Sequence, residues 1–348
     1  MHMQARFLFL ALMAAPLIAR PSIDVLVMKN GDRLTCEIKR LDKGVLYAGL
    51  AYVDGTISIQ WSQVVRVESS QLFLVQTEDG SVYRGTLRTV KTPAEQPVRV
   101  EVEETPQSRE TLERTRIVEV EQTSASFWKR FSGSIDSGMI YTKGNNTTQY
   151  NLGSKVTFRK ERWTAETQFS SALSKSTGTT TTTRNQLGLT GTRLMKRSNW
   201  FYTGVANFLQ SSQQGIDLQT SLGGGIGRFL MNTNRARVSL SSGLLWQGTQ
   251  YREGGDNPGT QNAVASFVAG DVQAFKFKKT TLSLTAGLLP VLSQPGRVRI
   301  NTNVMYSIQI INNLWWKFTF YGNWDNRPPA NFSGSDYGTS SGITYTFN

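Results

Sequence analysis

Histidine and cysteine are almost absent from this chain of 348 residues, which has one of each, His2 and Cys36. A disulfide needs two cysteines, so a disulfide framework is excluded. Cys/His metal sites need clusters of these residues, so we expect no metal centre. We predict that Cys36 is a small buried residue rather than a reactive thiol.

The shortage of histidine also limits catalysis. Ser–His hydrolysis in barrel proteins needs a histidine as base, and His2 lies in a segment that we expect to be removed. Carboxylates alone could act through Asp136, Glu166 and Asp271, but nothing in the sequence pairs them, and salt bridges are their expected role. We therefore predict no enzymatic activity, no catalytic residue and no cofactor.

Long apolar runs are absent too. Phe7–Ala19 is too short to span a bilayer as a helix and follows a short segment carrying Arg6. This pattern is typical of a secretory signal peptide, here residues 1–19, and a buried N-terminal helix is the alternative. No other stretch approaches the ~20 apolar residues of a membrane helix, so any later membrane insertion must use strands.

The formal net charge is +13, but lysine and arginine do not form one continuous run. We therefore expect no nucleic-acid partner.

Short strands dominate the first part of the chain. Asn30-Gly31, Asp54-Gly55 and Asp79-Gly80 are tight-turn signals within 24–87, which contains about seven candidate strands. We predict a small SH3/Sm-like β-domain over residues 20–90. Pro93, Pro97 and Pro106 then favour a linker over 91–127, with extended pieces at 98–102 and 117–120; a charged helix around 108–121 is the competing interpretation.

From residue 128 onward the chain alternates between apolar and polar residues, as strands with two different faces do. Trp316, Phe318 and Phe320 alternate with Lys317 and Thr319, for example. Gly223–Gly227 lies in such a strand, where glycines suit a curved barrel better than a phosphate loop. We predict an all-β fold ending in an antiparallel transmembrane barrel over residues 128–348. About twelve strands are expected, at 133–142, 147–159, 163–173, 184–194, 199–210, 217–229, 235–248, 263–276, 280–289, 297–309, 314–325 and 336–347.

The connections between these strands differ in length. Those after even-numbered strands are uniformly short, whereas several after odd-numbered strands are long, such as 249–262. Bacterial outer-membrane barrels have short periplasmic turns and longer outer loops. The pattern predicts a bacterial outer-membrane location with the N-terminal domain in the periplasm.

Three groups of residues in the barrel are candidates for specific roles. The final strand, with Ile343, Tyr345 and Phe347, is expected to pair with 133–142 and to carry the signal for the barrel-assembly machinery. The expected lumen-facing cations are Lys155, Arg159, Arg237, Arg297, Arg299 and Lys317. The expected aromatic girdle, in contact with outer-membrane lipid, consists of Trp163, Trp200, Trp246, Trp315, Trp316 and Trp324.

Several short motifs resemble a known family. They are KNGDRLT at 29–35, WSQV at 61–64, GSID at 133–136 and YTKGN at 141–145. In these the chain resembles the salt-induced outer-membrane protein family, YdiY-like barrels of unknown function. The resemblance implies an outer-membrane barrel, a link to salt stress and no established activity. Cys36 stands where that family usually has glycine, and Asn348 follows its usual terminal aromatic.

Three functional hypotheses follow from the sequence. The first is a non-enzymatic barrel with a structural or narrow-pore role in the envelope. The second is an interaction protein in which residues 20–90 bind a periplasmic partner and the barrel is the anchor. The third is a soluble, secreted β-protein.

Overall fold

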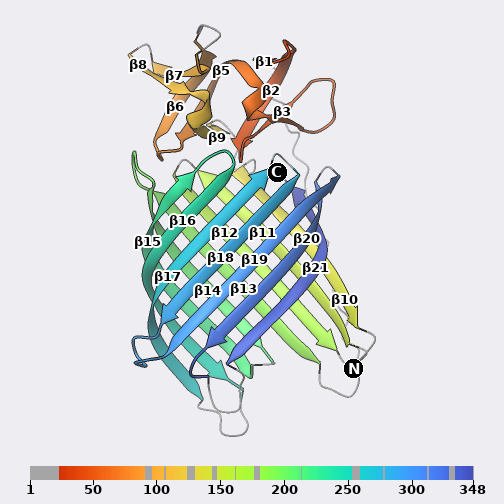
Figure 1. Cartoon of the computed structure of the whole chain (residues 1–348), viewed down its shortest axis with the longest axis vertical. Helices are drawn as coiled ribbons and strands as arrows, with labels where there is room; N and C mark the ends of the chain where they lie inside the picture. Colours follow the sequence, from red (N-terminus) through yellow and green to blue (C-terminus); the bar gives the residue numbers. More distant parts are fainter. Residues whose placement is uncertain are drawn as a thin grey trace, which may run out of the picture.

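A closed barrel and a smaller β-sheet domain make up the fold of the computed structural model (Figure 1). The described part of the chain has no helix that is long and apolar enough to cross a membrane. The expected signal peptide, residues 1–19, lies outside the described residues. The structure describes residues 23–90, 96–105, 107–123, 130–142, 147–160, 162–175, 181–212, 214–252, 259–276, 279–311, 313–328 and 334–347.

Twelve antiparallel strands, each paired with the next, form the barrel. All twelve expected strands are present, with bounds within three residues of those predicted, and Gly223–Gly227 lies inside a strand. The strands are β10 (Phe131–Thr142), β11 (Thr147–Lys160), β12 (Trp163–Lys175), β13 (Thr182–Leu194), β14 (Trp200–Ser211), β15 (Ile216–Asn232), β16 (Ala236–Tyr251), β17 (Thr260–Lys276), β18 (Thr280–Pro290), β19 (Val298–Ile311), β20 (Leu314–Asp325) and β21 (Ser335–Phe347).

The barrel closes where β21 pairs with β10, as predicted. The register runs from Gly133 opposite Phe347 to Ser137 opposite Ile343. Glycine is required at position 133, because a Cβ there would collide with the Lys155 backbone carbonyl oxygen of β11 and would also lie 2.6 Å from the tip of the Phe347 ring. Closure leaves neither strand with a free edge, so the backbone groups of both are paired.

Apolar and aromatic side chains of one parity are exposed on the outer surface of the barrel. In β21 these are Tyr337, Ile343 and Tyr345, and in β20 they include Trp316 and Phe318. Because strand residues alternate between the two faces, the polar residues of the other parity point inward. An apolar outer wall and a polar interior are the pattern of a barrel that spans a membrane.

The N-terminal domain is a nine-stranded sheet. β9 pairs with both β2 and β5, so β1, β2, β9 and β5 form a closed ring of pairings. The longest strand of this sheet is β5, which has an irregularity between Ser69 and Phe73. The strands are β1 (Asp24–Met28), β2 (Arg33–Asp42), β3 (Val45–Gly49), β4 (Ile57–Gln60), β5 (Val64–Thr77), β6 (Val82–Thr89), β7 (Arg99–Thr105), β8 (Ser108–Glu113) and β9 (Ile117–Gln122).

Cys36 lies in the core of this domain and is fully buried, together with Leu26, Ile38 and Phe73. Burial, reinforced by the nearby Asp24 and Glu37 carboxylates, raises the pKa of the Cys36 thiol to about 12. Since the thiolate is the reactive form, Cys36 has a packing role.

The expected linker over 91–127 is wrong for its larger part. Residues 99–122 supply β7, β8 and β9, which join the same sheet as the preceding strands. The prolines and charges suggested an open segment, but Val100, Val102 and Val120 alternate with those charges and are buried in the core. The charged residues between them pair on the other face, as Arg109 does with Glu103 at 2.8 Å.

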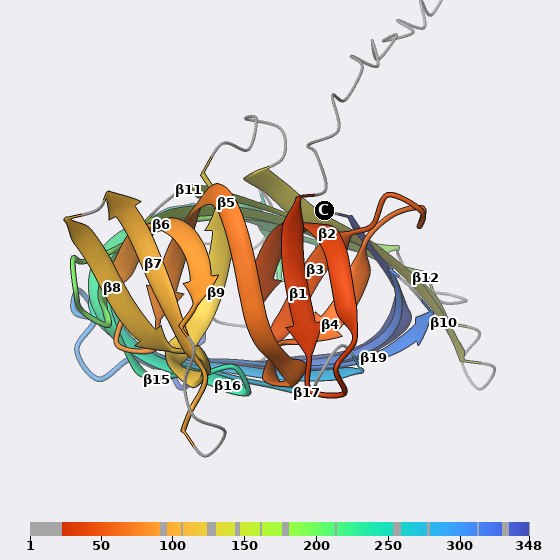
Figure 2. The same ribbon diagram turned by 90° about the horizontal axis from the view of Figure 1, so that it is seen from above.

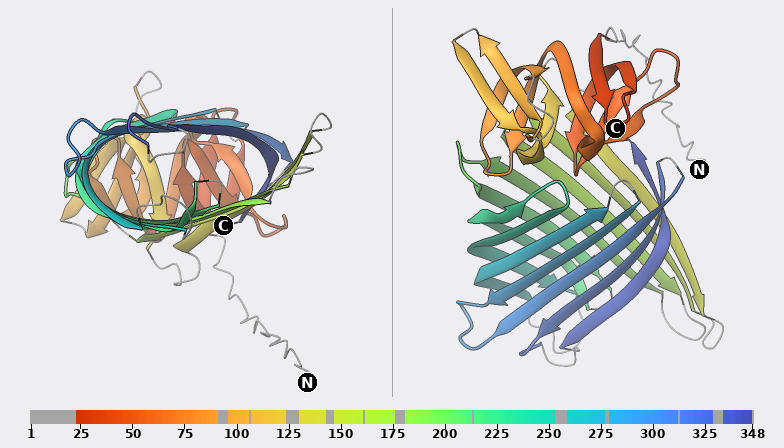
Figure 3. Two further views of the ribbon diagram at one scale, coloured as in Figure 1. Left: turned by 90° about the horizontal axis from the view of Figure 1, so that it is seen from below. Right: turned by 45° about the horizontal axis from the view of Figure 1, so that its top comes forward.

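The domain lies across one end of the barrel (Figures 1 and 2). We call this the domain end, and the opposite end the far end. The turns after the fourth and sixth barrel strands, β13 and β15, hydrogen-bond to the N-terminal domain through Asn199 and Asn234. The short connections that follow even-numbered barrel strands are therefore at the domain end. Seen from below, the barrel is oval, and the strands of the domain lie behind its opening (Figure 3).

The closing strand generates a prediction about assembly. Phe347→Ala removes the ring that covers Gly133 at the closure, whereas Thr346→Ala changes a small residue of the inward parity. We expect Phe347→Ala to lower the amount of assembled barrel severalfold and Thr346→Ala to leave it nearly unchanged. Quantifying the folded band on gels of unheated membranes measures this, and equal assembly of the two variants would refute it.

Candidate functional site at the domain end

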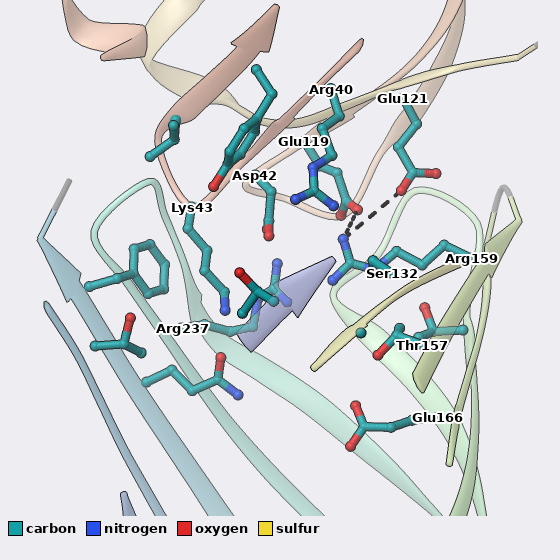
Figure 4. A pocket seen from close by; sticks show the side chains of 18 of the residues that line it. Arg40, Asp42, Lys43, Glu119, Glu121, Ser132, Thr157, Arg159, Glu166 and Arg237 are labelled. Carbon is teal, nitrogen blue, oxygen red and sulfur yellow. Dashed lines mark hydrogen bonds and ion pairs between the residues drawn. The ribbon is translucent and has the colours of Figure 1, made fainter. Parts of the chain in front are cut away.

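The tip of the β2–β3 hairpin enters the domain end of the barrel. Lys43 (φ 52°) and Gly44 (φ 73°) both have positive φ, which forms a tight turn. A side chain at position 44 would meet the Asn234 carbonyl oxygen at 2.7 Å, so glycine allows the tip to rest on the β15–β16 turn. The Lys43 side chain points from this tip into the barrel end (Figure 4), with its Nζ 5.9 Å from the centre of the Phe275 ring.

Three further contacts position the domain on the barrel. The Asn199 side-chain amide donates a hydrogen bond of 2.9 Å to the Glu78 carbonyl. The Asn234 amide donates one of 2.8 Å to the Ile117 carbonyl. Gly80, with φ 81°, packs so closely on the Ser198 carbonyl that no larger residue fits without a shift. The domain therefore has a defined orientation on the barrel.

Ion pairs connect the domain to the barrel wall between these contacts. The Arg159 guanidinium of β11 lies 2.9 Å from a Glu119 carboxylate oxygen and 4.0 Å from one of Glu121, both on β9 (Figure 4). The side chains of Arg159 and Glu119 are 25% and 17% exposed, so the pair is partly desolvated and stronger than a surface pair.

The carboxylates of this junction respond differently to their surroundings. Burial favours the neutral form of Asp42, but Arg159, Lys43 and other nearby cations outweigh burial and hold its pKa well below the usual range. Burial and the adjacent Glu119 raise the pKa of Glu121 to about 7, with only partial relief from Arg159. Burial also lowers the pKa of the Lys43 ammonium. Cations thus keep Asp42 ionised, whereas Glu121 titrates near neutrality.

A cavity of about 760 Å³ lies at the junction and is lined by both parts of the molecule. Among its lining residues six are basic and six are acidic, so the lining is balanced in charge. The six basic residues are Arg40, Lys43, Lys155, Arg159, Arg162 and Arg237, and the six acidic ones are Asp42, Asp54, Glu119, Glu121, Glu166 and Asp271. This balanced composition suits a polar interface between the N-terminal domain and the barrel better than a site that attracts one charged ligand.

The expected lumen cations occupy three regions of the barrel. Arg159, Arg237 and Lys155 line the junction cavity, and the Arg237 Nε donates to Asn232 Oδ1 at 3.1 Å. Lys155 pairs with Glu166 and Lys317 with Asp136, at 2.8 Å and 2.7 Å. At the far end the Asp325 carboxylate forms ion pairs with the guanidinium groups of Arg297, at 2.7 Å, and Arg299, at 3.1 Å. The carboxylates Asp136 and Glu166 are therefore salt-bridge partners.

Side chains from non-adjacent strands meet across the barrel interior towards the far end. Arg299 of β19 donates to the Gln247 side chain of β16. The Arg184 guanidinium of β13 lies 5.8 Å from the centre of the Tyr321 ring of β20. Because β13 and β20 lie on opposite walls in the strand order, the second contact spans the interior.

The tryptophans of the expected girdle divide into two groups. Trp163, Trp200, Trp246, Trp316 and Trp324 are exposed. Trp315 has the inward parity of Lys317, which pairs with Asp136, and it lines the junction cavity, so its expected place in the girdle is wrong. Trp163 also borders that cavity, but its side chain has the outward parity and is 53% exposed. Trp315 and Trp316 are consecutive in β20, and consecutive strand residues face opposite sides, so only one of them can face outward.

Sequence reasoning missed Lys43, Glu119, Glu121 and the two asparagines Asn199 and Asn234. The Asp42-Lys43-Gly44 turn between two apolar strands was a usable hairpin signal. The alternation of Ile117–Gln122 was a strand signal that also placed Glu119 and Glu121 on one face. Nothing in the sequence showed that both would meet Arg159.

The junction generates a testable prediction. Arg159→Gln should loosen the domain on the barrel, because it leaves Glu119 and Glu121 without their cation at a cost of about 1.5–3 kcal/mol. We expect hydrogen exchange of residues 195–199 and 233–235 in the full-length protein to rise roughly tenfold. Lys317→Gln is the matched control, since Lys317 pairs with Asp136 inside the barrel and does not line the junction cavity. Equal exchange in the two variants would contradict the assignment.

Comparison with known proteins gives one family match and several distantly similar solved structures. The family model described as a protein of unknown function, DUF481, matches residues 135–347. No curated protein matches the chain. Similar solved structures include the NanC porin, with 10% identity and a TM-score of 0.41 over 62% of this chain and 100% of that one. An outer membrane channel from Pseudomonas putida F1 has 10% identity and a TM-score of 0.38 over 62% and 94%. The translocator domain of the autotransporter NalP from Neisseria meningitidis has 12% identity and a TM-score of 0.36 over 62% and 86%.

Proposed function

The chain belongs to the DUF481 family of proteins of unknown function, and we propose that it is a non-enzymatic outer-membrane barrel with a structural or narrow-pore role. The N-terminal domain would then lie in the periplasm, because it covers the end with the short turns. The closed barrel with an apolar outer wall supports the membrane location.

The contacts across the barrel interior are the main support for the proposed role. The domain covers one end of the barrel, and Lys43 enters that end. Towards the far end, Arg184 meets Tyr321 and Arg299 meets Gln247 between non-adjacent strands. Twelve strands lie between the filled eight-stranded barrels and the open channels of sixteen or more. Both ends of this interior are therefore narrowed by the protein's own side chains, which suits a structural barrel or a pore of low conductance.

The partners of the candidate carboxylates among the described residues support a non-enzymatic role. Asp136 and Glu166 form salt bridges with lumen lysines, and Asp271 accepts hydrogen bonds from Thr285 and Gln273. The one histidine of the chain is His2, in the expected signal peptide. Structural partners thus account for the groups that a carboxylate mechanism would use.

Conductance in planar bilayers tests the narrow interior. We expect the full-length protein to give small or no steady conductance, and the double variant Arg184→Ala/Arg299→Ala to raise it severalfold by removing two contacts across the interior. Arg252→Ala is the control, since Arg252 is exposed and pairs with Asp217 of the adjacent strand β15 at 3.1 Å. A large steady conductance of the unaltered protein, unchanged in the double variant, would contradict the proposal.

An interaction role for the N-terminal domain is a second candidate. β8 lies at one end of the strand order, and its first four residues, Ser108–Thr111, are exposed. A free strand edge can accept an extended segment of a periplasmic partner by backbone hydrogen bonding.

A photo-crosslinking residue at position 110 in β8 tests this second role in intact cells. We expect a discrete crosslinked product of constant size there, and none from the same residue at position 52, which is 76% exposed but lies outside the strands. The same products from both positions would argue against a partner on this edge.

A further inference from the structure

Two tryptophans and two arginines form cross-strand pairs on the outer wall at the domain end. Trp163 is the first residue of β12 and lies directly opposite Arg193 of β13. Trp200 is the first residue of β14 and lies directly opposite Arg228 of β15. The guanidinium carbons are 5.0 Å and 5.6 Å from the indole centres, which is cation–π distance.

These side chains share the outward parity of their strands. Arg193 has the parity of exposed Leu189, and Arg228 has that of exposed Leu222 and Ile226. Both arginines and both tryptophans are exposed. Two guanidinium groups are therefore on the wall that the proposed function assigns to lipid.

The pairs join into one patch. Tyr202, also exposed, lies opposite Arg193 on its other side, so Arg193 lies between Trp163 and Tyr202. Tyr202 and Trp200 are on the same face of β14, which brings the second pair next to the first. We call Trp163, Arg193, Trp200, Tyr202 and Arg228 the rim patch.

The rim patch lacks an anion of its own. No ion pair among the described residues includes Arg193 or Arg228, whereas the lumen cations Lys155, Arg297, Arg299 and Lys317 each have a carboxylate partner. The sequence has no aspartate or glutamate between Glu166 and Asp217, or between Asp217 and Glu253. Asp217 itself pairs with Arg252.

The turn next to the rim patch adds further positive charge. Lys196 and Arg197, between β13 and β14, are both exposed. Gly80 of the N-terminal domain contacts Ser198 of this turn. The acidic residues just before Gly80 are Glu78 and Asp79, and both pair with Arg116. The local field at this rim is therefore positive.

The chemistry of the guanidinium and indole groups indicates which counter-ion the rim patch would bind. The planar guanidinium fork matches the oxygens of a phosphate, and indole rings favour the membrane interface, where headgroups lie. A guanidinium on a lipid-facing wall is costly unless its charge reaches an anionic group at the interface. We propose that the rim patch is a binding site for the headgroup phosphate of an anionic phospholipid.

This inference rests on the proposed membrane location, but it can fail separately from it. The cation–π pairs alone would stabilise the sheet whether or not a lipid binds. A purely structural role predicts that removing the arginines lowers stability without changing lipid preference. Lipid preference is therefore the decisive measurement, and heat-dependent gel migration shows independently that each variant is a folded barrel.

The test is native mass spectrometry of the full-length protein in detergent micelles, titrated with phosphatidylglycerol or phosphatidylcholine. We expect a preference for phosphatidylglycerol that falls roughly fivefold for each of Arg193→Gln and Arg228→Gln. Arg252→Gln, at an exposed arginine near the far end, should keep the preference of the unaltered protein. If a glutamine variant does not fold, Arg193→Lys replaces it, and loss of the guanidinium fork should still weaken the preference.

Three results would overturn the proposal. The unaltered protein could show no preference between the lipids, or Arg193→Gln and Arg228→Gln could keep the full preference while remaining folded. Inorganic phosphate could also displace phosphatidylglycerol as well as the lipid itself does, which would identify a general anion site rather than a lipid site. A folded barrel without lipid preference would leave the proposed function intact and remove this inference alone.

Discussion

Closure of the sheet is the constraint on which the rest of this structure depends. β21 pairs with β10 through Gly133 and Phe347, so the twelve-stranded sheet has no free edge. In the closed sheet every strand has one face towards the outside and one towards the interior. The alternation of apolar and polar residues along the strand decides which side chains each face presents. Apolar groups such as Ile343 and Tyr345 are exposed outside, whereas Lys155 and Lys317 meet Glu166 and Asp136 inside.

The same constraint explains the N-terminal domain. A closed barrel leaves two open ends, and at the domain end a second sheet supplies hydrogen bonds and charge. Arg159 of the wall pairs with Glu119 of β9, and Asn199 and Asn234 of the turns bond to the domain backbone. Towards the far end, contacts between non-adjacent strands of the barrel cross the interior, through Arg184 with Tyr321 and Arg299 with Gln247. A second sheet therefore covers the domain end, whereas the barrel's own side chains meet across the interior towards the far end.

Much of the barrel was predictable because its rules are local. Alternation, turn residues and connection lengths depend on neighbours along the chain, and all twelve strands followed from them. The linker prediction failed where two local signals competed: the prolines and charges of 91–127 outweighed the alternating Val100, Val102 and Val120, which are buried. The girdle prediction for Trp315 was wrong because the two-residue period of a strand was not applied to the two consecutive tryptophans of β20.

The candidate site was much less predictable because its contacts depend on how two separate sheets meet. No spacing in the sequence brings Lys43 into the barrel end or Glu119 to Arg159. The contacts across the interior depend on the size and oval shape of the closed barrel, which are properties of the whole sheet. The rim patch was similarly hidden, because its pairs exist only in the register of β12–β15.

A closed barrel that spans the bacterial outer membrane can be recognised by fractionation of cell envelopes combined with gel migration of heated and unheated samples. We expect the protein to stay in the outer-membrane fraction until detergent is added, and the unheated folded barrel to migrate differently from the heated chain. Release into aqueous buffer without detergent, with identical migration before and after heating, would contradict it.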